Sequence, residues 1–389
     1  MTAATLAIIM LIAIVGSLFA LRPGAFQVPV VIGELLLGIL FGASGLGLLD
    51  AGDPIFAFLG NDIGFALVMF VAGAHVPLRS PALRTGFARG AGYALAVGVL
   101  AVPAGLGLAA LFGTGHGLIY AVLIASSSAA LVLPSLGAAP VDGAPIVAMI
   151  AQIAIADAAC IILLPLVIEP AQAGPRALGV LAVLAGCLLL TTLLLWAERS
   201  GARRRVHAVS ERHELALELK ISLLLLFTMV AMAGLFGVSP MLAGFGVGLA
   251  VAAIGEPRRL GRQLFALTEG FFGPIFFVWL GAGLGLREVV DHPQMILLGL
   301  CLGLVAVLVH GLMVIGRQPL PVAVSTAAQL GVPIAAATLG RLTGAFADGE
   351  DVALIIGALL TVAVTAAASG SLTRLARSAS SSHPASVEP

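Results

Sequence analysis

The sequence predicts an all-α integral membrane protein with about 13 transmembrane helices. Three observations support this class: the composition, the spacing of apolar stretches and the signs of the charges between them. Sixty per cent of the 389 residues are hydrophobic and 10% are charged, whereas soluble domains average about 25% charged residues. The mean hydropathy is +1.14. The formal net charge is zero, so nothing in the composition indicates a nucleic-acid partner.

Apolar stretches long enough to cross a bilayer recur along the whole chain, since a spanning helix requires about 20 residues. Proline, glycine and charged residues separate them. The first stretch lacks basic residues before it and a small-residue cleavage site after it, so we expect a spanning helix rather than a signal peptide. The 13 stretches are residues 3–21, 27–48, 55–77, 86–112, 117–137, 143–168, 176–196, 218–235, 238–254, 264–286, 294–316, 319–342 and 350–373.

The charges between these stretches alternate in sign. With the N-terminus outside, most arginines lie in the inside loops and acidic residues lie in the outside loops, as the positive-inside rule requires. The few outside arginines are Arg176, Arg287 and Arg341. We therefore expect a multi-pass protein of the bacterial inner membrane, with its N-terminus outside and its C-terminus in the cytoplasm. The inside loops hold Arg22, Arg79, Arg84, Arg89, Arg199, Arg203, Arg204, Arg205, Arg258, Arg259, Arg262, Arg317, Arg374 and Arg377, and the outside loops hold Asp50, Asp53, Glu169, Asp291, Asp348, Glu350 and Asp351.

Two short stretches in the fifth and twelfth predicted helices resemble each other. Residues 126–134 read SSSAALVLP, and residues 325–333 read STAAQLGVP. An offset of seven helices is odd, so the two copies have opposite orientations in the membrane. This pattern predicts two inverted-topology repeats with discontinuous helices 5 and 12, an arrangement that marks binding sites in transporters. Two unrelated proline kinks are the alternative.

The repeat divides the chain into four segments. Residues 1–170 form the first repeat with helices 1–6. Residues 171–217 hold helix 7 and a polar cytoplasmic linker, and residues 218–375 form the second, inverted repeat with helices 8–13. Residues 376–389 are rich in serine and predict a disordered cytoplasmic tail.

Polar residues near the two prolines are candidates for a transport site. Pro134 and Pro333 each remove a backbone donor and free a carbonyl about one turn earlier, so both predict a helix break. Free carbonyls and hydroxyls can hold a cation where they line a cavity. Hydroxyls can instead bond back to their own helix. The candidate ligands or crossing-helix residues are Ser126, Ser127, Ser128, Ser325, Thr326 and Gln329.

Asp157 is an acid within the apolar sixth helix, in the stretch AIADAACIIL. A charged acid inside a bilayer is costly and usually marks a pathway for ions or protons. One carboxylate can hold either a proton or a monovalent cation, which is the basis of exchange. A structural aspartate that caps a neighbouring helix is the alternative. His310, in the eleventh helix, is a possible second titratable group or a core histidine whose hydrogen bonds are satisfied.

Several motifs together resemble one family. They are VPVVIGELLLGILFGASGLGLL in helix 2, GFALVMFVAGAHVPL in helix 3, SSSAALVLPSL in helix 5, GVSPMLAGFGVGLAVA in helix 9 and EGFFGPIFFVWLGAGLGL in helix 10. With them the sequence resembles bacterial monovalent cation:proton antiporters, a family that includes sodium/proton exchangers and the membrane domains of potassium efflux systems. The resemblance covers nearly the whole chain.

The resemblance implies the sodium/proton antiporter fold, in which two unwound helices cross in a core bundle and a second bundle forms a dimer interface. It also implies elevator-type alternating access, with the essential aspartate at the position of Asp157. Three features depart from the family pattern. Ala156 stands where many relatives have a second polar residue, His310 lies in the region of a family lysine, and Gln329 is the long polar side chain in the second crossing helix.

We therefore predict a secondary antiporter that exchanges Na⁺, with K⁺ or Li⁺ as alternatives, for H⁺. With one certain titratable site, the simplest stoichiometry is one to one and electroneutral. A channel, or a symporter of another solute on the same fold, is the alternative. A serine–histidine intramembrane protease is disfavoured because the stretch at Ser126 lacks a Gly-x-Ser-x-Gly turn. We expect no cofactor, no fused nucleotide-binding domain, a homodimer and contact with membrane lipid.

Overall fold

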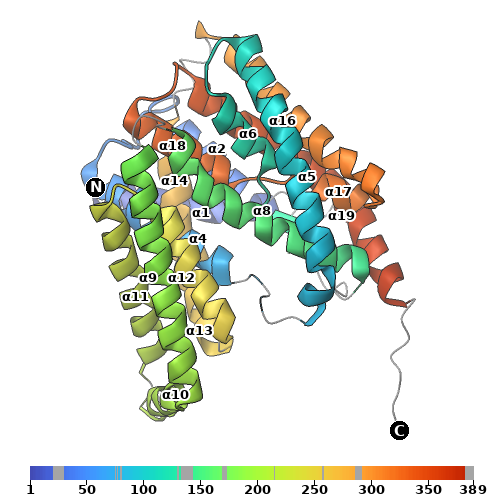
Figure 1. The fold of residues 1–389 in the computed structure, drawn as a ribbon. Coiled ribbons are helices and arrows are strands. Elements are labelled where there is room, and N and C mark those ends of the chain that lie inside the picture. The colour runs from blue at the N-terminus through green and yellow to red at the C-terminus, as the bar shows by residue number, and fades with distance from the viewer. Residues whose placement is uncertain are drawn as a thin grey trace. The chain divides into compact units, whose positions relative to one another are not determined.

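The computed structural model describes residues 1–20, 30–74, 76, 78, 81–128, 131–132, 143–168, 173–213, 215–255, 258–284 and 291–381. These residues form helices joined by turns, and none of them lies in a β-strand, so the predicted all-α class is confirmed (Figure 1). The helices group into two compact units.

The first unit contains the N-terminal helices and the middle of the chain. Its helices α9, α11 and α12 lie side by side, as Figure 1 shows. Its elements are α1 (Ala3–Ala20), α2 (Val30–Phe41), α3 (Pro54–Ala57), the π-helix η1 (Phe58–Gly64), α4 (Phe65–Ala74), α9 (Ala173–Arg199), α10 (Ala202–Arg212), α11 (Leu217–Leu235), α12 (Pro240–Ile254), α13 (Arg258–Leu267), the π-helix η3 (Thr268–Phe272) and α14 (Gly273–Gly283).

Glycine lets α4 and α12 pack backbone against backbone. A Cβ atom on Gly244 would lie 2.3 Å from the carbonyl oxygen of Ala66, and one on Gly248 would lie 2.3 Å from that of Phe70. No side chain fits at either distance. Because lipid tails are as apolar as leucine, membrane helices associate through such close contacts between small residues.

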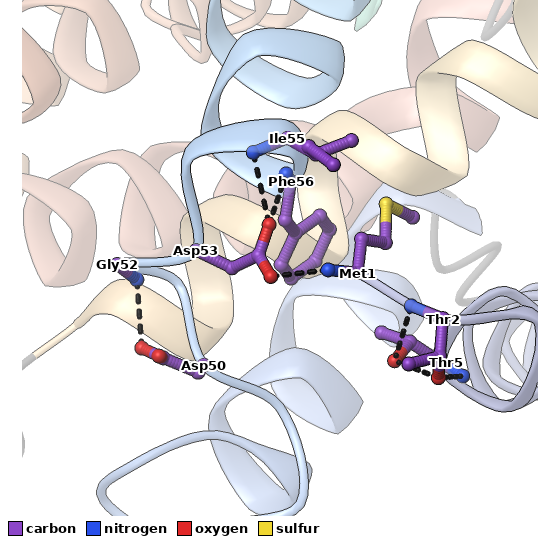
Figure 2. A network of polar contacts seen from close by, with 8 residues as sticks. All are labelled: Met1, Thr2, Thr5, Asp50, Gly52, Asp53, Ile55 and Phe56. Atoms are coloured by element: carbon purple, nitrogen blue, oxygen red, sulfur yellow. Dashed lines mark hydrogen bonds and ion pairs between the residues drawn. The ribbon is translucent and has the colours of Figure 1, made fainter.

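Asp53 starts the run α3–η1–α4. Its carboxylate accepts hydrogen bonds from the backbone N–H groups of Ile55 and Phe56, at 2.9 and 3.0 Å, and an ion pair from the α-amino group of Met1 (Figure 2). The Met1 amino group and the two N–H groups hold the pKa of Asp53 below its usual range. An aspartate at the N-cap, followed by proline at the first helical position, is a strong signal for a helix start.

The second unit contains both predicted crossing helices and Asp157. Its helix α8 packs against α5, α6, α17, α18 and α19. The elements of this unit are α5 (Pro81–Phe112), α6 (Gly117–Ala125), α8 (Ala144–Ile168), α16 (Gln294–Gly311), the 3₁₀-helix η4 (Leu312–Gly316), α17 (Leu320–Ser325), α18 (Gly331–Thr343) and α19 (Glu350–Ser381).

Two predicted spans are interrupted. Helix α6 ends at Ala125 and is followed by three non-helical residues, and α17 ends at Ser325 before the chain resumes as α18. Pro333 lies in the first turn of α18, where a missing N–H removes no helical hydrogen bond. The second break therefore lies about one turn before its proline. Pro134 lies outside the described residues.

Each of the 13 predicted stretches overlaps a described helix. Eight of the described helical segments are long and apolar enough to cross a membrane, and three shorter helices, Ala3–Leu18, Val30–Phe41 and Pro240–Ile254, are apolar. The number of membrane crossings and the division into repeats stay predictions.

The C-terminal boundary differs from the expected one. Helix α19 continues to Ser381, so residues 376–381 are helical rather than part of a tail. The reason is that Leu372 and Ala376 are fully buried in an apolar cluster with Met149 of α8. Residues 382–389 lie outside the described part of the chain.

Candidate functional site

Asp157 lies near the middle of α8, the helix that packs against α6, α17 and α18. Its side chain is 8% exposed. The neighbouring Ala156 and the cysteine one turn later, Cys160, are buried as well. Helix α8 therefore carries one buried carboxylate and packs against both interrupted helices.

Side chains at the two breaks bond to each other. Ser126 Oγ lies 2.9 Å from Gln329 Oε1, and Ser127 Oγ donates to the carbonyl of Thr326 at 2.6 Å. All four residues are buried. The hydroxyl proton of Ser126 is shared, because the carbonyl of Leu123 also lies 2.8 Å away. The structure thus brings together residues about 200 positions apart, as the inverted repeat leads one to expect.

The second break is also tied to α19. The backbone N–H of Gln329 donates to Thr361 Oγ1 at 3.3 Å, and the Thr361 hydroxyl donates to the carbonyl of Ala358 at 2.7 Å. Backbone groups at a break lack helical partners and need others when buried. Thr361 supplies one, and the sequence pattern gave no indication of it.

His310 joins the two breaks from α16. It is fully buried, and both ring nitrogens have partners: Nδ1 lies 2.9 Å from Thr326 Oγ1, and Nε2 lies 3.2 Å from the carbonyl oxygen of Ile124. Ile124 is in the last turn of α6, whose final carbonyls have no helical donors. A carbonyl only accepts, so Nε2 carries a proton.

Two further glutamines extend this cluster, and sequence reasoning did not select them as site residues. Gln152 of α8 donates from Nε2 to Thr326 Oγ1 at 3.3 Å, and Gln318 donates from Nε2 to Gln152 Oε1 at 2.7 Å. Gln318 follows Arg317 in what the sequence predicts to be an inside loop. Arg317 has a left-handed backbone with φ of 66°, and Gln318 is 3% exposed. No periodicity in the sequence predicts that the backbone turns at Arg317 and buries the side chain of Gln318.

The remaining candidate serines have local roles. Ser325 Oγ donates to the carbonyl of Pro321 in its own helix at 2.6 Å, which is the back-bonding alternative. The carbonyl of Ser128 accepts the backbone N–H groups of Leu131 and Val132. Most of the polar oxygens at the breaks are therefore engaged in holding the crossing segments.

The chemistry of this site is that of a carboxylate rather than of a metal cluster. Among the described residues, no group of three or more His, Cys, Asp or Glu side chains could hold a metal ion. A buried carboxylate can take up a proton or a hard monovalent cation, which prefers oxygen ligands. A bound proton or a bound monovalent cation neutralises the negative charge of the carboxylate.

A family model described as sodium/hydrogen exchanger, transmembrane, matches residues 7–374. The chain belongs to the sodium/hydrogen exchanger family. Members of this family are multi-pass membrane transporters rather than enzymes, so the family resemblance is confirmed and the protease alternative is rejected.

Two curated relatives and one solved structure agree with this assignment. The chain is 25% identical over 358 residues to the putative Na⁺/H⁺ antiporter YjbQ of Bacillus subtilis, with 86% of this chain and 57% of the relative covered. It is 24% identical over 363 residues to the probable Na⁺/H⁺ antiporter 3 of Methanocaldococcus jannaschii, with 87% and 89% covered. The chain thus spans little more than half the length of the Bacillus protein.

The fold is similar to that of the sodium proton antiporter MjNhaP1 from Methanocaldococcus jannaschii. The TM-score is 0.63 at 15% sequence identity, and the match covers 96% of this chain and 98% of the other. The predicted sodium/proton antiporter fold is therefore confirmed.

Proposed function

We propose that this chain exchanges a monovalent cation for H⁺ across the bacterial inner membrane, with Na⁺ as the first candidate and K⁺ or Li⁺ as alternatives. Membership of the exchanger family and the printed activities of the two relatives support the class of reaction. The observation that carries the proposal is the buried Asp157 on the helix that packs against both interrupted helices.

Exchange follows from competition for Asp157. A carboxylate loaded with a proton or a cation is neutral overall, and it can cross an apolar region at low cost. A bare carboxylate is charged, and moving it through the bilayer costs several kcal/mol. Transport of either ion alone would require the return of the bare carboxylate, so the two fluxes are coupled in opposite directions.

The stoichiometry we propose is one cation for one proton, which is electroneutral. Ala156 occupies the position beside Asp157 where a second polar residue would add another site. His310 is fully buried, with both ring nitrogens hydrogen-bonded to protein groups. These bonds support a role for His310 in holding the crossing segments rather than in carrying charge.

The division into two compact units supports an elevator-type mechanism. In this proposal the second unit, which holds Asp157, moves as the ion carrier, and the first unit forms the contact of a homodimer. The N-terminus lies outside and the C-terminus in the cytoplasm, in accordance with the loop charges. Membrane lipid surrounds the dimer, and the transported ions are its only small-molecule partners.

The test is proton movement in everted membrane vesicles on addition of Na⁺, K⁺ or Li⁺. Wild-type vesicles should release a preformed proton gradient on cation addition, and Asp157→Asn should abolish this response while leaving the protein folded, because the amide is the same size but binds neither ion as a carboxylate does. The exposed Asp291→Asn is the matched control and should behave as wild type. Wild-type rates in Asp157→Asn would overturn the site. Cation uptake without proton movement would point to a channel or a symporter.

A further inference from the structure

Four hydrogen bonds form one directed chain through the second unit. Gln318 Nε2 donates to Gln152 Oε1 (2.7 Å), Gln152 Nε2 points at Thr326 Oγ1 (3.3 Å), Thr326 Oγ1 meets His310 Nδ1 (2.9 Å), and His310 Nε2 donates to the carbonyl of Ile124 (3.2 Å). The four side chains are each at most 3% exposed. The chain thus connects the segment before α17, helix α8, the second break, helix α16 and the end of α6.

The direction of the chain is set from both ends. At one end the carbonyl of Ile124 only accepts, so His310 must present Nε2–H. At the other end Gln318 Nε2 donates to Gln152 Oε1, and Gln152 Nε2 donates to Thr326 Oγ1. The amide of Gln152 therefore presents its oxygen to Gln318 and its N–H to Thr326.

The Thr326 hydroxyl determines the protonation state of the His310 ring, because this hydroxyl has one proton and two acceptors nearby. These are His310 Nδ1 and the carbonyl oxygen of Ala323, which lies 2.7 Å away. If the proton goes to Ala323, Nδ1 must carry a proton of its own and the ring is an imidazolium. If the proton goes to Nδ1, the ring is neutral.

Gln152 favours the arrangement in which Thr326 donates its proton to Nδ1 and the His310 ring is neutral, for two reasons. A hydroxyl that accepts a hydrogen bond becomes a stronger donor, because bonds in a chain polarise one another. The N–H of Gln152 also directs the positive end of an amide dipole toward Thr326. That dipole disfavours a positive charge on the adjoining ring.

We propose that Gln318 and Gln152 are positioning residues that act through Thr326 to hold His310 as the neutral tautomer with its proton on Nε2. The inference rests on the proposed exchange function and deepens it. A His310 that stays neutral leaves Asp157 as the group whose charge changes during transport. Gln318 lies at the end of the hydrogen-bond chain opposite Ile124, and it would then help to keep exchange electroneutral.

The neighbouring elements carry several charged and titratable groups, some of which are hydrogen-bonded to other residues. Helices α5, α6, α17 and α19 and the 3₁₀-helix η4 pack against α16, and Asp157 lies on α8, which contacts α6 and α17. Tyr93 donates to the carbonyl of Gly316, and Arg374 donates to Ser371. The groups concerned are Arg84, Arg89 and Tyr93 on α5, Tyr120 on α6, and Glu350, Asp351, Arg374 and Arg377 on α19, with none on α17 or η4.

The test is nitrogen-15 NMR of purified full-length protein labelled at its seven histidines. His310→Gln identifies the resonances of His310. The wild type should show a protonated ε nitrogen and an unprotonated, hydrogen-bonded δ nitrogen. Gln318→Met keeps a side chain of similar length but removes the donor to Gln152, so the δ-nitrogen resonance should shift and a protonated δ-nitrogen signal should appear.

Two further variants separate positioning from general damage. Thr326→Val should shift the δ nitrogen as well, while Thr326→Ser, which keeps the hydroxyl, should restore the wild-type spectrum. Thr365→Val is the matched control, because it removes a buried hydroxyl that has no partner among the described residues. This hydroxyl is not part of the chain of hydrogen bonds from Gln318 to Ile124. It should leave the His310 signals unchanged.

An imidazolium or an Nδ1–H tautomer in the wild type would overturn the proposal, and so would identical His310 spectra in wild type and Gln318→Met. In proteoliposomes, Gln318→Met should make exchange sensitive to an imposed membrane potential, whereas wild-type exchange should be insensitive. The spectra are read without transport. A wild type that moves no protons would therefore contradict the exchange function alone, and the tautomer would still be decided.

Discussion

The hydrogen bond between Ser126 and Gln329 gives a sharp prediction about the crossing of the two interrupted helices. It joins the end of α6 to the segment after α17 at 2.9 Å, and both residues are buried. Ser126→Ala and Gln329→Met each remove one partner and keep the other. In a double-mutant cycle, the difference between the double variant and the sum of the singles isolates the energy of this one contact.

The structure limits the coupling energy that we expect between Ser126 and Gln329. Side-chain hydrogen bonds inside membrane proteins are worth about 0.6 kcal/mol on average and about 1.7 kcal/mol at most. Ser126 keeps the carbonyl of Leu123 as a second acceptor at 2.8 Å, so the loss falls short of the maximum. We expect a coupling of about 0.6–1.4 kcal/mol, which is about a 3- to 10-fold change in the unfolding equilibrium.

The assay is reversible unfolding of purified protein in mixed micelles with increasing SDS, read by circular dichroism. The control cycle pairs Ser126→Ala with Thr338→Val on α18, because the Thr338 hydroxyl is buried with no partner among the described residues. The control coupling should be zero within error. A coupling between Ser126 and Gln329 that is equally small would show that the two breaks do not meet in the membrane.

Three further predictions concern packing, a helix start and a buried acid. Gly248→Ala should lower the unfolding free energy by about 1–3 kcal/mol because its Cβ would meet a carbonyl of α4 at 2.3 Å, whereas Gly98→Ala, with open space at its Cβ, should be nearly neutral; thermal unfolding compares them. The pKa of Asp53 lies below its usual range, so its stabilisation of the start of α3 is complete above about pH 4 and is lost as the pH falls through the lowered pKa. Amide hydrogen exchange at the start of α3 should follow this loss. Glu350→Ala should cost at least about 3 kcal/mol in the same SDS assay, because the fully buried carboxylate accepts bonds from His116 at 2.8 Å and Tyr120 at 2.6 Å.

Much of the fold is predictable because a bilayer imposes simple rules on composition. An apolar stretch of the right length must satisfy its backbone internally, so it forms a helix. The match between residues 126–134 and 325–333 predicts where two helices are interrupted, and the structure interrupts both near these places. The predicted start of the tail at residue 376 differs from the structure, in which α19 continues to Ser381. Small residues and serines after residue 375 are typical of a tail, and the sequence does not show that Ala376 is buried.

The partners within the site are less predictable. Asp157 stands out in the sequence because an acid is costly in an apolar helix. Gln318 does not, because a glutamine after Arg317 resembles any loop residue. Its contact with Gln152 depends on how the chain turns at Arg317 and on the packing of helices more than 150 positions apart. The pairing of Glu350 with His116 is equally hidden, since both read as residues of outside loops.

The measurement that tests competition at Asp157 most directly is the dependence of the apparent KM for Na⁺ on pH, in proteoliposomes with equal pH on both sides. If one carboxylate binds either one proton or one cation, the apparent KM should rise about tenfold for each unit of pH decrease on the acid side of the profile, while the maximal rate at saturating Na⁺ stays constant. A KM that does not change with pH would contradict competition. A rise of about 100-fold per unit would contradict the one-to-one exchange, because two protons would then compete with each cation.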